Sequence, residues 1–178
     1  KVIDVGAHIG FHTLTFAKLV GDHGKVYAFE PCPENAELLK KNVAINGYKN
    51  IEIIQKAVSD KTGMVGFFVD NFHSGTHRIV DSDSNCSIEV ESIRLDELNL
   101  SPQFIKIDIE GREYFAFQGM KETLQKHKPI IVTEYNEKHL QAAGITSQQF
   151  LDQLKHLGYA YKTIDGKNLV CRFPEKIR

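Results

Sequence analysis

The chain has 178 residues, of which 42% are hydrophobic and 25% are charged, and its formal net charge is −1. This is the composition of a globular chain long enough to bury a sizeable core, and the balanced charge excludes a global basic field for nucleic acid or anionic membranes. The three cysteines form no CxxC pair, which excludes a disulfide framework and a zinc-finger pattern and favours a reducing, cytoplasmic location.

The apolar residues of the first third of the chain alternate between the spacing of strands and the spacing of helices. Prolines at the start of the second helical segment and a glycine after its end are typical of helix boundaries. The pattern predicts strands at residues 1–5, 25–30 and 50–58, separated by helices at residues 10–20 and 31–47.

Residues 59–95 interrupt this regular order, and we call them the excursion. They carry turn signals and two short β-like pieces, at residues 64–69 and 87–93. We expect the excursion to form a hairpin or edge strands together with a polar loop.

Strands and helices alternate again after the excursion. Buried apolar runs predict strands at residues 103–111 and 128–135. Helical spacing predicts one helix that ends near Gly119, a short one that ends at His127, and a third at residues 146–159. Two short runs around a Gly-Lys turn predict a terminal hairpin, at residues 159–165 and 168–173.

This order of elements predicts an α/β fold: a mostly parallel sheet with helices on both faces and an antiparallel hairpin at its C-terminal edge. No repeat or linker divides the chain, so we expect residues 1–178 to form a single domain. No apolar run approaches the about 20 residues that span a bilayer. Because the chain begins at Lys1, directly on a strand, we expect a further segment before it in the natural protein.

The loop after the first strand, in KVIDVGAHIG, carries the first functional signal. Ligands of such sheets bind at the carboxyl ends of the strands, where Gly6 permits a sharp turn against a ligand and Gly10 permits a close helix start. The dinucleotide pattern G-x-G-x-x-G fails because His8 stands at its middle glycine. Asp4 would repel a pyrophosphate and suits a positively charged group. The loop therefore favours S-adenosylmethionine (SAM) over a nicotinamide dinucleotide.

The end of the second strand adds a nucleoside signal. Glu30 follows the glycine loop by about 20 residues, and a carboxylate there accepts hydrogen bonds from the two ribose hydroxyls. The alternative is that Glu30 only caps the next helix. Pro31 is placed to pack on an adenine ring. After the third strand the residues that would border the ring's other side and edge are Ala57, Val58 and Ser59 or Asp60, unless this is a plain core strand and turn.

Four motifs, DVGAHIGFHTL, GKVYAFEPCPENAELLKKN, KAVSD and IKIDIEGRE, occur in an order that resembles the FkbM family of SAM-dependent methyltransferases. The resemblance runs from Val2 to about Tyr135. It implies a Rossmann-like class I methyltransferase fold and O-methylation of a small hydroxylated acceptor, such as a sugar or a secondary metabolite. His8 stands where the family commonly has asparagine.

The resemblance also implies roles by position. The first loop and Glu30 would hold SAM, residues 57–59 would border adenine, and Asp108 and Glu110 would face the transfer site. The loop positions concerned are Asp4, Gly6, Ala7, His8 and Gly10.

A hydroxyl acceptor needs a group that takes its proton, and acids at strand carboxyl ends are the natural candidates. Asp108, Glu110 and Glu134 hold such positions, and any of them could act as the base or orient the acceptor, although Glu110 could instead cap a helix. In the excursion, FHSGTHR offers His77, ranked above His73, as a base or a shield of the site, with a solvated loop as the alternative.

Histidine spacing raises the question of a metal. His8 and His12 are four residues apart, as are His73 and His77, but no pattern of H-E-x-x-H type accompanies them. We therefore expect no metal. The segment EKHL, at residues 137–140, is interpreted as surface charge.

Two other functions stay open at this point. A nicotinamide-dependent oxidoreductase is disfavoured by the missing middle glycine and by Asp4. A non-catalytic methyltransferase-like interaction module is disfavoured because it would have no need of Asp4, Glu30 and Asp108. A small molecule, rather than nucleic acid or a membrane, is the expected partner, and the sequence leaves the oligomeric state open.

Overall fold

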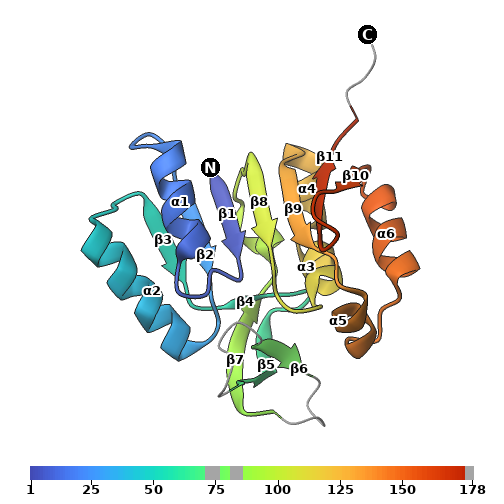
Figure 1. Cartoon of the computed structure of the whole chain (residues 1–178), viewed down its shortest axis with the longest axis horizontal. Helices are drawn as coiled ribbons and strands as arrows, with labels where there is room; N and C mark the ends of the chain where they lie inside the picture. Colours follow the sequence, from blue (N-terminus) through green and yellow to red (C-terminus); the bar gives the residue numbers. More distant parts are fainter. Residues whose placement is uncertain (71–76, 81–85, 175–178) are drawn as a thin grey trace.

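The computed structural model describes residues 1–70, 77–80 and 86–174. Within these residues the main sheet has the strand order β10–β11–β9–β8–β1–β2–β3 (Figure 1). Its strands are β1 (Val2–Val5), β2 (Val26–Phe29), β3 (Ile51–Ile54), β8 (Phe104–Ile107), β9 (Ile130–Glu134), β10 (Ala160–Thr163) and β11 (Asn168–Arg172).

The main sheet is parallel from β3 to β9 and ends in an antiparallel hairpin, as predicted. The hairpin inserts β11 beside β9, antiparallel to it, and leaves β10 at the edge. The sequence pattern predicted that the edge strand itself runs antiparallel. The antiparallel strand is instead β11, which lies next to the edge strand β10.

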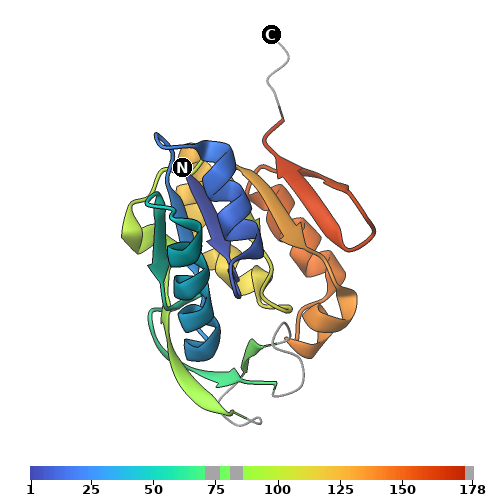
Figure 2. The same cartoon turned by 60° about the vertical axis from the view of Figure 1, so that its left-hand side comes forward.

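Helices cover both faces of the main sheet, as Figures 1 and 2 show. On one face Val2 packs with Ala17 of α1, and on the other Ile3 packs in a cluster with Phe117 of α3 and Leu154 of α6. Alternate residues of one strand thus serve the two faces. The helices are α1 (Phe11–Val20), α2 (Pro33–Asn46), α3 (Glu113–Gly119), α4 (Lys121–His127), α5 (Glu137–Ala142) and α6 (Ser147–His156).

A second, smaller sheet lies beyond the carboxyl ends of the central strands, at the bottom of Figure 1. Its order is β4–β7–β5–β6, and β5 and β7 form the antiparallel pair that the excursion predicted. Phe67 and Val90 pack with Cys32 in a core of their own. The strands are β4 (Ala57–Val58), β5 (Gly63–Phe68), β6 (Arg78–Val80) and β7 (Ile88–Ile93).

The third predicted strand, residues 50–58, is in fact two strands in two sheets. The chain turns at Lys56, whose backbone N–H donates to the carbonyl of Ile54 at 2.8 Å, and β4 then pairs in parallel with β7. A 3₁₀ helix, η2 (Leu95–Leu98), and the helix α5 were not predicted. His73 and much of the predicted polar loop lie outside the described residues. Across the part of the chain that the structure describes, no helix combines the length and the apolar character needed to cross a membrane.

Candidate active site

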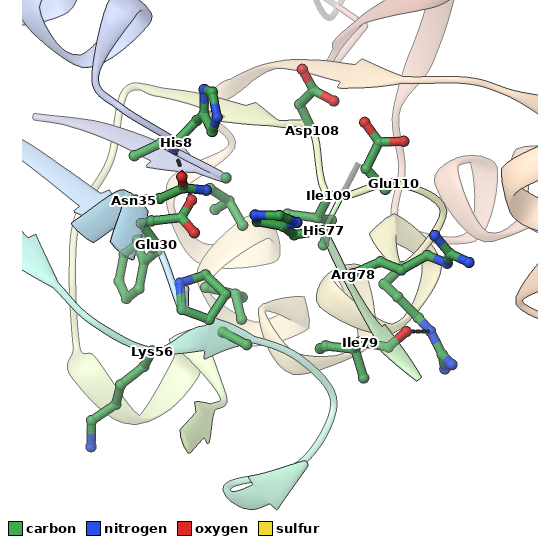
Figure 3. Close-up of a pocket in the computed structure, with 18 of the residues that line it drawn as sticks. His8, Glu30, Asn35, Lys56, His77, Arg78, Ile79, Asp108, Ile109 and Glu110 are labelled. Carbon is green, nitrogen blue, oxygen red and sulfur yellow. Dashed lines mark hydrogen bonds between the residues drawn. The ribbon is translucent and has the colours of Figure 1, made fainter. Parts of the chain in front are cut away.

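A cavity of about 270 Å³ opens between the carboxyl ends of the main sheet and the smaller sheet (Figure 3). Figure 3 shows His8 and Glu30 on one side of this cavity and Asp108 and Glu110 on the other, with His77 between them. The predicted site residues that line it are Gly6, Ala7, His8, Glu30, Pro31, Ala57, Val58, His77, Asp108 and Glu110.

The first loop is held tightly between two strands. The backbone N–H groups of Gly6 and Ala7 both donate to the carbonyl of Phe29, at 3.0 and 2.9 Å. Gly6 has φ +83°, and a Cβ there would lie 2.0 Å from the carbonyl oxygen of Asp108. Only glycine satisfies both conditions, so position 6 fixes how closely the β1 and β8 loops approach one another.

His8 also occupies the left-handed region, with φ +51°. Asparagine, aspartate and histidine enter this region several times more often than other residues with a Cβ. The backbone therefore explains why histidine can replace the asparagine that the FkbM resemblance leads one to expect here.

We expect His8→Asn to leave the free energy of unfolding nearly unchanged, and His8→Val to lower it by about 1–2 kcal/mol, because a β-branched residue is strained at positive φ. Denaturant unfolding of both variants measures this. His23→Val, in an exposed turn with ordinary φ, is the matched control. Equal losses in His8→Val and His23→Val would contradict the backbone argument.

Glu30 joins the first loop to the start of α2. Its Oε2 accepts from the backbone N–H of His8 at 2.8 Å, and its Oε1 accepts from that of Cys32 at 3.0 Å. Burial raises the pKa of Glu30, while the hydrogen bonds from Cys32, His8 and the Asn35 side chain oppose the rise. Cys32 is the N-cap of α2, so this hydrogen bond corresponds to the alternative role of Glu30 at the start of the helix. Glu30 also lines the cavity. Its ribose role stays a prediction.

Lys106 is a site residue that the sequence analysis missed. Its ammonium lies 3.4 Å from Asp108 Oδ2 and 3.7 Å from Asp4 Oδ1, and it donates to the carbonyl of Gly6 at 3.3 Å. The side chain is 12% exposed and lines the cavity. A lysine inside the otherwise apolar strand FIKI is the signal that could have revealed it.

Asp4 lies behind the cavity wall. It is fully buried and accepts a 2.6 Å hydrogen bond from Thr13, with Lys106 as its charged neighbour. Burial raises the pKa of Asp4, and the Lys106 charge opposes the rise. The positive partner that the sequence assigned to a ligand is thus supplied by the chain itself, which corrects the expectation that Asp4 contacts the cofactor directly.

Three more predicted site residues do not line the cavity. Gly10 packs under α2, where a Cβ would meet Leu39 at 2.6 Å. The Ser59 hydroxyl donates to Asp60, and its N–H donates to the carbonyl of Ile93. Glu134 lies behind the cavity wall, where its Oε2 is 3.3 Å from His139 Nδ1, and His139 Nδ1 in turn lies 3.1 Å from Glu110. These three positions therefore shape the site from behind, which differs from the direct contact expected of them.

His77 lines the cavity with a defined hydrogen-bonding role. Its Nδ1 accepts from the backbone N–H of Asp70 at 3.0 Å, so its ring proton sits on Nε2. Burial lowers the pKa of His77, which favours this neutral form. A neutral ring that carries its proton on Nε2 donates hydrogen bonds there, so His77 is better suited to orient an acceptor than to take its proton.

The turn after β8 presents Asp108 and Glu110 to the cavity. Glu110 lies at φ +58°, a left-handed conformation that is uncommon for a glutamate. The buried Glu113 holds the turn from below, because its Oε1 accepts from the backbone N–H of Ile109 at 2.9 Å. Non-glycine residues held at positive φ concentrate at functional sites.

Two arginines complete the wall. Arg78 and Arg112 line the cavity, and Arg112 Nε donates to the carbonyl of Ile79 at 3.0 Å. The sequence analysis assigned neither arginine a role of its own. Arg112 follows the IDIEG motif directly, and Arg78 ends the polar run FHSGTHR of the excursion.

The family model "Methyltransferase FkbM domain" matches residues 4–161. The chain belongs to this family. Its fold, a mostly parallel sheet with helices on both faces, is that of the class I SAM-dependent methyltransferases, as the sequence predicted. Family and fold together identify SAM as the cofactor.

Three relatives illustrate the similarity. Hexuronic acid methyltransferase AglP of Haloferax volcanii is 29% identical over 135 residues, which cover 72% of this FkbM chain and 53% of AglP. The crystal structure of a methyltransferase FkbM from Methylobacillus flagellatus KT has a TM-score of 0.67 at 21% identity and covers 96% of this chain and 43% of that one. A SAM-dependent O-methyltransferase from Thermotoga maritima has a TM-score of 0.56 at 16% identity, over 99% and 60% of the two chains. The FkbM chain thus spans about half the length of AglP.

Proposed function

We propose that residues 1–178 form one methyltransferase domain that transfers a methyl group from SAM to a hydroxyl group of a sugar-type acceptor. The observation that carries this proposal is the cavity at the carboxyl ends of β1, β2 and β8. It joins a glycine loop and Glu30 on one side to Asp108 and Glu110 on the other. One side suits a nucleoside cofactor, and the other suits an acceptor that must lose a proton.

The cavity residues fit SAM. Gly6 lines the cavity and, because it has no Cβ, lets the β1 loop lie against the backbone of Asp108, and Glu30 is a buried carboxylate at the place where such folds bind ribose hydroxyls. The apolar surfaces for adenine are Pro31, Ala57 and Val58. When bound, SAM supplies a methyl group activated by a positively charged sulfur.

The sugar-type acceptor is inferred from AglP, which is a hexuronic acid methyltransferase. Arg78 and Arg112 support an acceptor with an acidic group, because both residues line the cavity and Figure 3 shows Arg78 on the side of Glu110. Arginine pairs well with carboxylates through its planar fork of donors. A hexuronic acid offers both hydroxyl groups and such a carboxylate.

The residues on the acceptor side have different roles in the proposed reaction. Lys106 holds Asp108 in place through its ammonium group, and His77 offers its Nε2–H as a donor that orients the acceptor. Glu110 is the carboxylate placed to take the acceptor's proton. Most of the remaining rate enhancement comes from holding the reacting groups in line.

Calorimetry with SAM, followed by transfer of a labelled methyl group to glucuronic acid, tests this proposal. We expect binding of SAM, no binding of NADH, and labelling of glucuronic acid above that of glucose. Stability of the product in mild alkali distinguishes a methyl ether from a methyl ester. Heat with NADH and none with SAM would favour the oxidoreductase, and heat with neither would favour the non-catalytic module.

We expect Glu30→Ala to weaken SAM binding by about 1–3 kcal/mol, the scale for losing a charged hydrogen-bond partner. Calorimetric titration measures the change in affinity. Glu52→Ala, which removes an exposed carboxylate from β3, is the control and should bind SAM like the parent protein. Unchanged affinity in Glu30→Ala would remove the ribose role of Glu30.

A further inference from the structure

A cluster of two carboxylates and an imidazole lies beside the acceptor side of the cavity. His139 Nδ1 is 3.1 Å from Glu110 Oε2 and 3.3 Å from Glu134 Oε2. The three side chains are partly buried, with 35%, 18% and 14% of His139, Glu110 and Glu134 exposed. They come from α5, the turn after β8 and the end of β9, so the tertiary fold brings them together.

The backbone holds the cluster in place. Glu110 and Gly111 both lie at positive φ, +58° and +96°. A Cβ on Gly111 would lie 2.4 Å from the carbonyl oxygen of His139, so this turn packs directly on the backbone of α5. This packing holds Glu110 in its strained conformation. In that conformation the Glu110 side chain lines the cavity and its carboxylate lies beside His139.

Asn136 settles which nitrogen of His139 carries the proton. As the N-cap of α5, its Oδ1 accepts from the backbone N–H of Lys138 at 3.1 Å, which fixes its amide nitrogen as the atom 3.2 Å from His139 Nε2. An amide nitrogen only donates, so His139 Nε2 must accept. The ring proton therefore sits on Nδ1, between the two glutamates.

This arrangement suits proton exchange better than metal binding. The ligand atoms of Glu110, Glu134 and His139 lie within 4.8 Å of one another, which is close enough for a metal ion. A metal, however, needs the lone pair of the nitrogen that faces it. Here Nδ1 carries a hydrogen, and the lone pair on Nε2 is taken up by Asn136. The geometry favours a donor between two carboxylates.

We propose that His139 is a positioning residue that donates its Nδ1–H to Glu110 and Glu134 and so holds Glu110 as the general base for the acceptor. The proposal rests on the methyl transfer proposed above. In the step itself the acceptor O–H bond breaks, its electron pair stays on the acceptor oxygen, and the proton forms a new O–H bond on the Glu110 carboxylate. Glu110, still partly exposed, then returns the proton to water.

The charges around Glu110 place this exchange near neutral pH. The groups that face it are Asp108 on its own turn, Glu134 on β9, His139 on α5 and Arg78 on β6. Burial, followed by the Glu134 charge, raises the pKa of Glu110 to about 7, and the Arg78 charge opposes the rise. A base is most effective when its pKa lies near the working pH. The His139 Nδ1–H stabilises the ionised carboxylate by hydrogen bonding, so its removal should make Glu110 harder to ionise.

The proton position is tested without any substrate. Imidazole ¹⁵N spectra of the unliganded protein, with the His139 signal identified from its loss in His139→Leu, should show a protonated Nδ1 and an unprotonated Nε2. Titration with Mg²⁺, Mn²⁺ and Zn²⁺ should leave this signal unchanged. A proton on Nε2, or a metal that binds the wild type but not His139→Leu, would overturn the proposal.

The positioning role is tested with two variants. The amide nitrogen of asparagine is as many bonds from the backbone as histidine Nδ1, so His139→Asn keeps a donor that His139→Leu removes. In His139→Leu we expect the Glu110 carboxyl titration, followed by ¹³C spectra, to move to higher pH by about one pH unit. The acid limb of kcat/KM should move with it, and turnover at high pH should fall about tenfold. His139→Asn should stay close to wild type.

His156→Leu, an exposed histidine on α6, is the matched control and should change neither curve. Identical titrations of Glu110 in wild type and His139→Leu would overturn the proposal. If SAM binding or methyl transfer fails in the wild type, the proposed function fails, while the carboxyl titration still decides the role of His139.

Discussion

Gly6→Ala is expected to abolish detectable SAM binding and to lower the free energy of unfolding by about 2–5 kcal/mol. The added methyl group would lie 2.0 Å from the carbonyl oxygen of Asp108, so the β1 and β8 loops must move apart. Overpacking of this kind costs about 1–3 kcal/mol, and the left-handed backbone adds about 1–2 kcal/mol for alanine. Calorimetry and denaturant unfolding measure the two effects.

Gly166→Ala separates the two causes. Gly166 lies at φ +81°, almost the same as +83° at Gly6, but a Cβ there would meet nothing within 4 Å. The control should therefore show only the smaller backbone cost and should bind SAM normally. Equal losses of stability in both variants, with SAM binding retained in Gly6→Ala, would show that the close approach of the two loops is unimportant.

The part of the site nearest the cofactor could be predicted because its signals are local. Gly6 and Glu30 directly follow β1 and β2, and the ends of neighbouring parallel strands meet at one edge of a sheet. Apolar spacing also located both strands and the helices after them. Short sequence windows hold all of this information.

The second sheet could be predicted only in part. The β5–β7 hairpin has a local signal, but β4 pairs with β7, with Ala57 opposite Ser92. That pairing joins residues far apart in the sequence, and the apolar run from 50 to 58 reads as one strand. The turn at Lys56 is decided by tertiary contacts, which strand periodicity does not contain.

Lys106 and His139 show why polar site residues are harder to find. The role of Lys106 depends on β8 lying beside β1, which places its ammonium between Asp4 and Asp108. EKHL was interpreted as surface charge, and α5, with six residues, is too short to show a helical pattern in the sequence. His139 acquires its role only when the Glu110 turn packs on it.

Glu110→Gln is expected to lower turnover by about 10²–10⁴-fold, the range for loss of a general acid or base. SAM affinity should change little, because Glu110 lies on the opposite side of the cavity from Glu30 (Figure 3). In the wild type, kcat/KM should rise with pH through about 7, since a base works in its ionised form and burial raises the pKa of Glu110 to about 7. The residual kcat/KM of Glu110→Gln should not show this rise with pH.

Two further variants make the assignment specific. Glu122→Gln, an exposed position on α4, should retain wild-type turnover and the same pH profile. Asp108→Asn disturbs the pairing with Lys106 and should lower turnover. It should keep the acid limb, displaced to lower pH because the Asp108 charge helps to raise the pKa of Glu110. If Asp108→Asn instead removes the limb and Glu110→Gln retains it, Asp108 is the base. The strained turn at Glu110 would then serve only to bring Asp108 into line with the acceptor.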